Sequence, residues 1–248
     1  MRDENTTLWR EWGKSAVLLG MSIYLILLIL GGNLDNYINI SLIWLTWLAV
    51  GLLLLLGLWS AWQLLKRHNL ARQHDVGDYQ HPRVSWWSVG IVGLPLFFAL
   101  AFPSRPLDAS AAQSVSLSPI GGRGMAASFS IPPEQRNILD WLREFSRVGN
   151  PASFEGQRAD VIGFIYREPD MSATQFMVAR FSVSCCVADA FALGLPVEYA
   201  SAAEFETGAW VRITGTLSAG EFMGQSIPIL QPELIEPTDI PETPYLYG

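Results

Sequence analysis

The sequence has few charged residues and little cysteine. Only 16 % of its 248 residues are charged, whereas half are hydrophobic and the mean hydropathy is +0.25. A soluble globular domain carries about a quarter charged residues, so an ordinary cytosolic enzyme is disfavoured. The formal net charge of −7 argues against a general nucleic-acid binder, which needs positive charge. Two cysteines are too few for a disulfide scaffold.

The second half of the chain also lacks the residues of common catalytic sets. Residues 104–248 contain no histidine and no lysine, which excludes Ser-His-Asp, Cys-His and Ser-Lys arrangements within them. No spacing there pairs two carboxylates for acid–base work. We therefore expect a protein that is not an enzyme. The same residues hold nine arginines against seventeen acidic residues, so we expect no nucleic-acid partner.

Three apolar runs dominate residues 1–103, which we interpret as a membrane domain. Residues 15–32 and 40–65 carry no charge. At about 1.5 Å per residue the second run reaches about 39 Å, enough to cross a hydrocarbon layer of ~30 Å. Residues 85–102 are shorter and contain Pro95, with a buried or re-entrant segment as the alternative to a span. We expect three transmembrane helices, at about 15–32, 40–65 and 85–102.

Tryptophan and basic residues indicate how these runs lie in a bilayer. Eight of the ten tryptophans precede residue 103, in pairs near the run ends, which is typical of interfacial belts. The connection at 33–39 has no Lys or Arg, but the next connection is basic, and this asymmetry places the N-terminus in the cytoplasm and everything after residue 102 outside. No ionisable residue lies inside a run, which favours anchors over a transport pathway. The basic residues of that second connection are Lys66, Arg67, Arg72 and Arg83.

Residues after 103 predict a linker and a small β domain. Residues 104–128 are rich in Ser, Ala, Gly and Pro, as linkers are. The domain over 129–248 begins with one amphipathic helix at 137–148. The expected architecture is membrane α plus a soluble β-rich (α+β) part, a partly open five-stranded barrel of the oligonucleotide-binding (OB) shape, with a split sandwich as the alternative. Its strands are expected at 160–167, 175–184, 196–200, 209–217 and 226–235, the last at an edge because of its prolines.

Both cysteines, Cys185 and Cys186, are adjacent. A disulfide wants about 4.4–6.8 Å between Cα atoms and neighbours stand ~3.8 Å apart, so a bond between them would be strained and easily reduced. The pair either packs as small core residues, binds a metal or is a redox element. Asp189 follows at a turn-like spacing, and thiolates with a carboxylate suit zinc or copper, although three ligands leave a tetrahedral site incomplete. Cys185, Cys186 and Asp189 are the candidate metal ligands.

All three histidines lie in the basic second connection, beside two aspartates. Histidine with carboxylate is a metal-binding combination, but the spacing here matches no metal signature. We interpret the segment as a solvated loop that fixes orientation. The five residues are His68, His74, Asp75, Asp78 and His81.

Residues 164–217 carry a resemblance to a known family. The stretch 180–190, RFSVSCCVADA, is similar to the Cys-Cys-x-x-Asp-Ala signature of the YcgQ-like membrane protein family, and NILDWL at 137–142 also resembles it. That uncharacterised family is described as permease subunits. The resemblance covers nearly the whole chain and implies a polytopic permease-like partner, but no activity. The chain departs at 191–193, where Phe-Ala-Leu follows the signature in place of an expected proline.

Together these features predict a membrane-anchored accessory subunit of a permease-like complex, with that partner and the lipid bilayer as its contacts. Its outer β domain would gate the complex or present substrate, such as a soft metal ion. Two alternatives stay open. One is an outward-facing thiol redox protein, in which only Arg180 or a helix start could lower a thiol pKa. The other is a plain ligand-binding module whose cysteines only pack.

Overall fold

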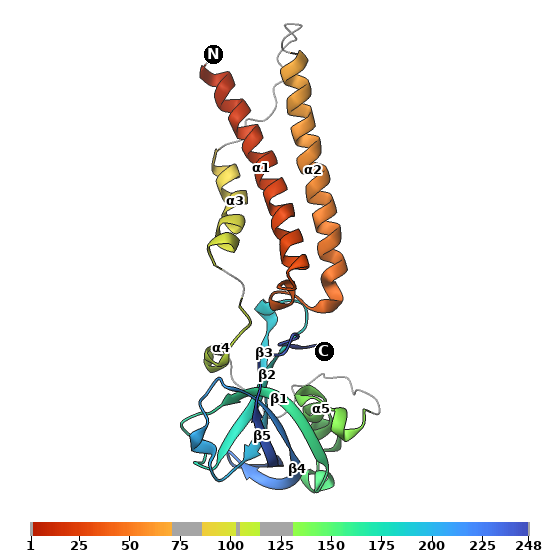
Figure 1. The fold of residues 1–248 in the computed structure, drawn as a ribbon, viewed down its shortest axis with the longest axis vertical. Coiled ribbons are helices and arrows are strands. Elements are labelled where there is room, and N and C mark those ends of the chain that lie inside the picture. Colours follow the sequence, from red (N-terminus) through yellow and green to blue (C-terminus); the bar gives the residue numbers. More distant parts are fainter. Residues whose placement is uncertain (1, 71–85, 103–104, 115–130, 248) are drawn as a thin grey trace. The chain divides into compact units, whose positions relative to one another are not determined.

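The chain divides into two compact units, residues 1–105 and 106–248, which we describe separately. The computed structural model in Figure 1 describes residues 2–70, 86–102, 105–114 and 131–247. His74, Asp75, Asp78 and His81 of the expected basic loop lie outside these ranges, and His68 belongs to the last turn of a helix.

The first unit is built from three helices, α1 (Arg2–Leu30), α2 (Ile43–Leu70) and α3 (Trp86–Ala101). Two segments of the described residues are helical, long and apolar enough to cross a membrane: Glu11–Leu30 and Ile40–Lys66. Only 11 % of each segment is buried within the protein. Their apolar side chains therefore need a surrounding apolar phase, as a bilayer provides.

The third expected span is not confirmed. Helix α3 has 16 residues and includes Pro95, and its apolar part, Val89–Ala101, is shorter than the two candidate spans. Among the described residues there are two candidate spans, not three.

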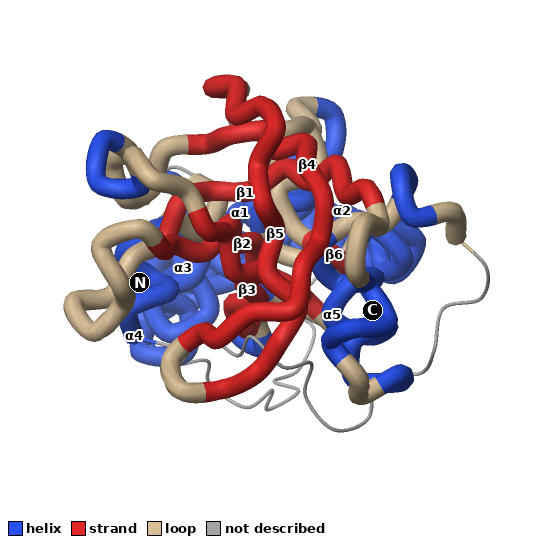
Figure 2. The backbone as a smooth tube through the Cα atoms, turned by 90° about the horizontal axis from the view of Figure 1, so that it is seen from below, coloured by secondary structure: helices blue, strands red, loops and turns tan. Residues whose placement is uncertain are grey.

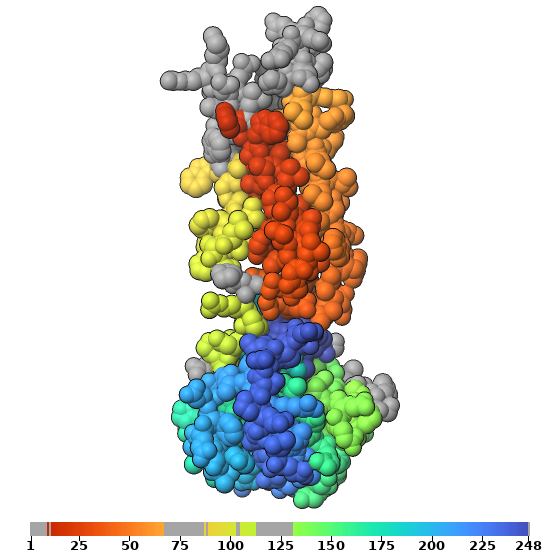
Figure 3. Space-filling model, viewed as in Figure 1, coloured from red at the N-terminus to blue at the C-terminus, as the bar shows by residue number. Residues whose placement is uncertain are grey.

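Small side chains hold the helices of this unit together. Ser15 is buried and its hydroxyl donates to Ser60 Oγ at 2.8 Å, joining α1 to α2. A Cβ on Gly57 would lie 2.9 Å from the side chain of Leu19, so glycine allows this close approach. Helix α3 packs on α1, where the Tyr24 hydroxyl donates to the carbonyl oxygen of Ala99 at 3.3 Å. Figure 3 shows the three helices side by side.

The second unit is a five-stranded barrel, and its OB-like character is confirmed; the barrel is closed rather than partly open as expected. Neighbouring strands run antiparallel from β1 to β2 to β3, and from β1 to β4 to β5. A parallel contact at Val197 and Leu230, between β3 and β5, closes the ring, which Figure 2 shows curling around itself. The strands are β1 (Arg158–Tyr166), β2 (Gln175–Val183), β3 (Phe191–Glu198), β4 (Trp210–Phe222), β5 (Gln225–Pro237) and a short β6 (Leu246–Tyr247).

Two strand expectations were wrong in detail. Strand β3 begins at Phe191, five residues before the expected start, because residues 192–197 are buried without alternation and so show no period-2 pattern. Strand β5 is not an edge strand, since it lies between β4, which pairs along its length, and β3, which pairs with it at Val197 and Leu230. Its Pro232 is tolerated at a bulge opposite Gly215. A Cβ placed on Gly215 would clash with the carbonyl oxygen of Gln231, so this position requires glycine.

The expected helix at 137–148 is confirmed as α5 (Ile138–Val148), and its local sequence explains both ends. Asn137 and Asp140 form a reciprocal capping box at the start. Gly149 ends the helix in the left-handed region at φ 72°. The apolar face of α5 closes the barrel core, where Trp141 and Leu142 are fully buried.

Part of the expected linker belongs to the barrel unit. Residues 109–114 form a short helix, α4 (Ala109–Ser114), whose Ala109 and Ala112 are buried in a second core cluster. The backbone N–H of Leu107 donates to the Tyr245 hydroxyl at 2.9 Å. Alanine-rich composition is shared by linkers and by helices that approach a sheet closely, so it could not tell the two apart.

Candidate metal-binding turn

The candidate ligands lie in the turn between β2 and β3. Strand β2 ends at Val183, and a 3₁₀ turn at Val187–Asp189 precedes the start of β3 at Phe191. In a continued strand the side chains of Cys185 and Cys186 would point to opposite faces. Because strand β2 has ended at Val183, both cysteine side chains can point towards the same position.

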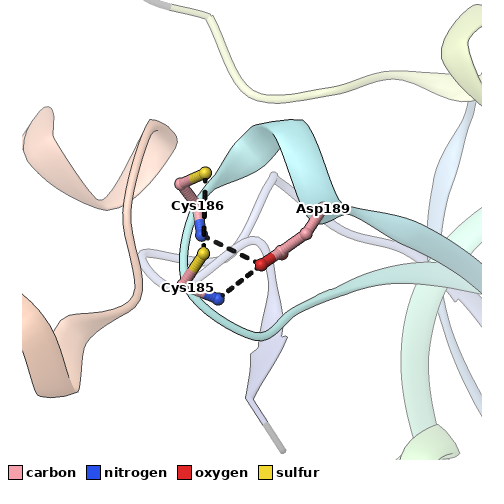
Figure 4. Close-up of side chains that lie close together, drawn as sticks. All are labelled: Cys185, Cys186 and Asp189. Carbon is pink, nitrogen blue, oxygen red and sulfur yellow. Dashed lines mark hydrogen bonds between the residues drawn. The ribbon is translucent and has the colours of Figure 1, made fainter.

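Asp189 closes this turn. Its Oδ1 accepts the backbone N–H of Ser184 at 2.9 Å, and its Oδ2 accepts those of Cys185 at 2.8 Å and Cys186 at 3.4 Å. Figure 4 shows the carboxylate facing the two cysteine amides. Hydrogen bonding from the Cys185 thiol, and then from these backbone groups, holds the pKa of Asp189 below its ordinary value. The three-residue spacing seen in the sequence therefore does bring the carboxylate beside the thiols.

The two thiols are free and lie side by side. Their Sγ atoms are 3.8 Å apart, and the candidate ligand atoms of Cys185, Cys186 and Asp189 all lie within 4.8 Å of one another. Cys185 is exposed and Cys186 is half-buried. Neither cysteine belongs to the two core clusters of the barrel. Core packing, one alternative for this pair, does not describe these positions.

The surroundings of Cys185 disfavour its thiolate. A hydrogen bond with Asp189, followed by one with Cys186, raises the pKa of Cys185 to about 11. Such a thiol is protonated almost completely at neutral pH, and the thiolate is both the nucleophile and the metal ligand. The protonated thiol counts against the redox alternative, and a metal ion has to displace its proton to bind.

Arg180, which could have lowered a thiol pKa, is engaged elsewhere. The guanidinium of Arg180 is buried, lies 5.9 Å from the centre of the Trp210 ring and donates through Nε to the carbonyl oxygen of Pro244 at 3.2 Å. A second donor reaches the carbonyl oxygen of Thr243. Burial lowers the pKa of Arg180 to about 10. Its charge holds the C-terminal segment rather than the thiols.

Comparison with known proteins agrees with the two-unit division. Residues 14–117 match the model of the DUF1980 N-terminal domain, and residues 124–248 match that of the DUF1980 C-terminal domain. The chain belongs to the DUF1980 family. Both matches together cover the apolar helices and the barrel.

Two relatives resemble this DUF1980 chain over most of its length. The "Putative two-component membrane permease complex subunit" of Streptococcus mutans serotype c is 23 % identical over 257 residues, covering 88 % of this chain and 92 % of the relative. The "UPF0703 protein YcgQ" of Bacillus subtilis (strain 168) is 24 % identical over 277 residues, covering 93 % and 97 %. The resemblance to YcgQ-like proteins is thus confirmed, and the first relative together with the two apolar helices agrees with a membrane location.

Among solved structures, a small single-stranded DNA-binding protein from Streptomyces coelicolor is 10 % identical. It matches 34 % of this chain and 93 % of its own chain. Its TM-score is 0.23, which is too low to bear on the fold or the function of the DUF1980 chain.

Sequence reasoning missed how this DUF1980 turn is supported. Strand β6 pairs in parallel with the end of β2, at Ser182 with Leu246 and Val183 with Tyr247. The partners are far apart in the sequence, and a two-residue strand leaves no periodic signal. One signal was available: Arg180 is the one charged residue in the strand β2, and a charge in an apolar strand needs partners.

Proposed function

We propose that this DUF1980 protein is the membrane-anchored accessory subunit of a permease-like complex, and that its barrel gates the complex or presents a soft metal ion from the turn. The observation that carries the proposal is the extent of the match to the Streptococcus mutans relative, which is named as a permease complex subunit. The match extends over both units of the present chain, so the relative shares the apolar helices as well as the barrel domain.

The helices support an anchoring and docking role. Segments 11–30 and 40–66 are apolar and mostly exposed on the protein surface, and pumps and carriers usually have an ionisable residue at membrane depth. Within residues 15–32 and 40–65 there is no charged side chain. A lipid-exposed pair of helices with no polar path suits a subunit that binds a larger polytopic partner.

The proposed orientation follows from basic residues. Four Lys or Arg residues lie between residues 66 and 83, whereas none lies between residues 33 and 39. Basic loops stay in the cytoplasm. For the barrel to lie on the outer side, the apolar run at 85–102, which contains α3, has to cross the bilayer as a third span. Residues 104–248 carry a formal charge of −8, so an outward barrel of this composition attracts cations and repels anions.

A hollow in the described part of the barrel could serve the alternative function of a plain ligand-binding module. It lies beside the end of α5 and the start of β5, has a volume of about 230 Å³, and includes Phe145, Phe154 and Ile227 in its lining. Ligand pockets usually enclose about 300–1,000 Å³, so this hollow is small for that role. We therefore place the turn ahead of the hollow as the functional site.

Purification from gently solubilised membranes tests the proposal. The full chain, tagged and extracted in a mild detergent, should bring down one polytopic membrane protein in near-equal amount. A chain carrying Cys185→Ser and Cys186→Ser should still do so, because docking is assigned to the helices. An unrelated two-helix membrane protein with the same tag is the background control. A tagged chain that purifies alone refutes the accessory role.

A further inference from the structure

We infer that the turn binds one zinc ion through the thiolates of Cys185 and Cys186 and the carboxylate of Asp189, with the fourth coordination position open to a ligand from outside the chain. The inference deepens the proposed function and rests on it in one respect: an open site exchanges its ion, and in a permease complex that exchange is with the partner or the transported species.

The sulfur spacing fits a tetrahedral ion. With Zn–S bonds of about 2.3 Å and a tetrahedral angle, two thiolate ligands stand about 3.8 Å apart. The Sγ atoms of Cys185 and Cys186 are 3.8 Å apart. A linear two-coordinate ion with bonds of the same length would hold its sulfurs about 4.6 Å apart. The thiols are therefore spaced for zinc before any metal arrives.

Asp189 has room for one more interaction. A carboxylate offers about four lone-pair sites, and three of them accept the backbone N–H groups of Ser184, Cys185 and Cys186. The sulfur atoms of Cys185 and Cys186 lie within 4.8 Å of the Asp189 carboxylate oxygen, so the fourth site is available to an ion that both sulfurs also bind. Zinc binding requires the thiols to lose their protons, and the three backbone hydrogen bonds to Asp189 stay in place.

The turn supplies three ligands, which leaves the fourth position of a tetrahedral zinc ion open. All three ligands come from one turn of five residues, Cys185 is exposed, and the ligand atoms lie within 4.8 Å of one another. Structural zinc sites are closed by four protein ligands, whereas sites that act on another molecule keep one position free. Calcium and magnesium prefer shells made of oxygen, so the two sulfurs select against them.

Zinc titration of the purified full chain tests the inference. The chain, in mild detergent with reductant, is stripped with a chelator and then titrated with zinc alone against a chromophoric competitor. We expect one equivalent per chain, and no measurable binding after Cys185→Ser or Cys186→Ser. Asp189→Asn should weaken binding about 10- to 100-fold. Glu206→Gln, which removes an exposed carboxylate in another loop, should change nothing.

Unfolding temperatures, cobalt spectra and the number of zinc ions per chain distinguish loss of the site from loss of folding. Serine is nearly isosteric with cysteine and both positions are at least partly exposed, so unfolding temperatures should be unchanged in the serine variants. Cobalt(II) in place of zinc should give the thiolate charge-transfer band and the intense visible bands of a tetrahedral site. No zinc uptake above the double-serine variant, one zinc per two chains, or a preference for copper(I) over zinc would overturn the inference.

The two proposals fail in different ways. A chain that binds zinc but purifies without a polytopic companion keeps the metal site and loses the permease role. A chain that brings down the companion but binds no zinc keeps the role and loses the site.

Discussion

Replacing Asp189 with asparagine should make the Cys185 thiol more reactive. Asp189 is the first cause of the raised pKa of Cys185, which stands at about 11. Without the carboxylate charge, the pKa of this exposed thiol should fall towards an ordinary value near 8.5–9. At pH 7, a fall from about 11 to about 9 raises the thiolate fraction about 100-fold.

The expected gain in rate is smaller than the gain in thiolate. Thiolate nucleophilicity falls with pKa, with a Brønsted coefficient of about 0.4–0.5, so a decrease of two pKa units reduces intrinsic reactivity about 6- to 10-fold. The net acceleration of alkylation is then roughly 10- to 15-fold. Cys186 also raises the pKa of Cys185, so a Cys186→Ser background should give the lower end of that range.

The assay is iodoacetamide alkylation at pH 7 with a chelator present, in chains that carry Cys186→Ser so that one thiol reacts. The chain with Asp189→Asn is compared with the chain that keeps the aspartate. A matched control carries Asp170→Asn, which removes an exposed carboxylate from the loop between β1 and β2. Equal rates with and without Asp189, or the same acceleration in the control, would refute the assigned electrostatics.

Three further predictions address orientation, pH and packing. Thr207→Cys in a chain without the native cysteines should be labelled by an impermeant maleimide in intact cells, and labelling only after permeabilisation contradicts the proposed orientation. The folded chain holds the Cys185 proton more tightly than the unfolded chain does. The protonated thiol therefore stabilises the folded state below about pH 9, and this contribution is lost between about pH 9 and 11. The unfolding temperature should fall more across this pH window in the unchanged protein than in Cys185→Ser. Leu142→Ala, at a fully buried position of α5, should reduce the free energy of unfolding by about 2–5 kcal/mol in chemical denaturation, and a loss below 1 kcal/mol argues against the described core.

Arg180 offers a test of how the turn is supported. Arg180→Met keeps an unbranched apolar side chain beside Trp210 but removes the donors to the carbonyl oxygens of Thr243 and Pro244. Strand β6 should then detach more often from the end of β2, which ends at Val183. Hydrogen exchange measured by mass spectrometry should accelerate in residues 243–247. Unchanged exchange there would show that the buried charge does not anchor the segment.

Local patterns in the sequence were sufficient for several features. Long uncharged runs predicted the two candidate spans, because a helix satisfies its own backbone hydrogen bonds and needs only apolar side chains around it. The 3.6-residue period of the apolar residues predicted α5. The adjacency of Cys185 and Cys186 and the spacing to Asp189 pointed to one turn, since contacts across three or four residues depend on little else.

Other features depended on which distant segments meet. Composition could not show that Ala109 and Ala112 pack into the barrel, or that β5 lies between two strands. Most important for the site, a strand would separate the two sulfurs, and they stand 3.8 Å apart because β2 ends where three backbone amides turn to the Asp189 carboxylate. The local sequence is enough to name the candidate ligands. Whether their side chains converge depends on where strands β2 and β3 end, and only pairing between distant segments determines that.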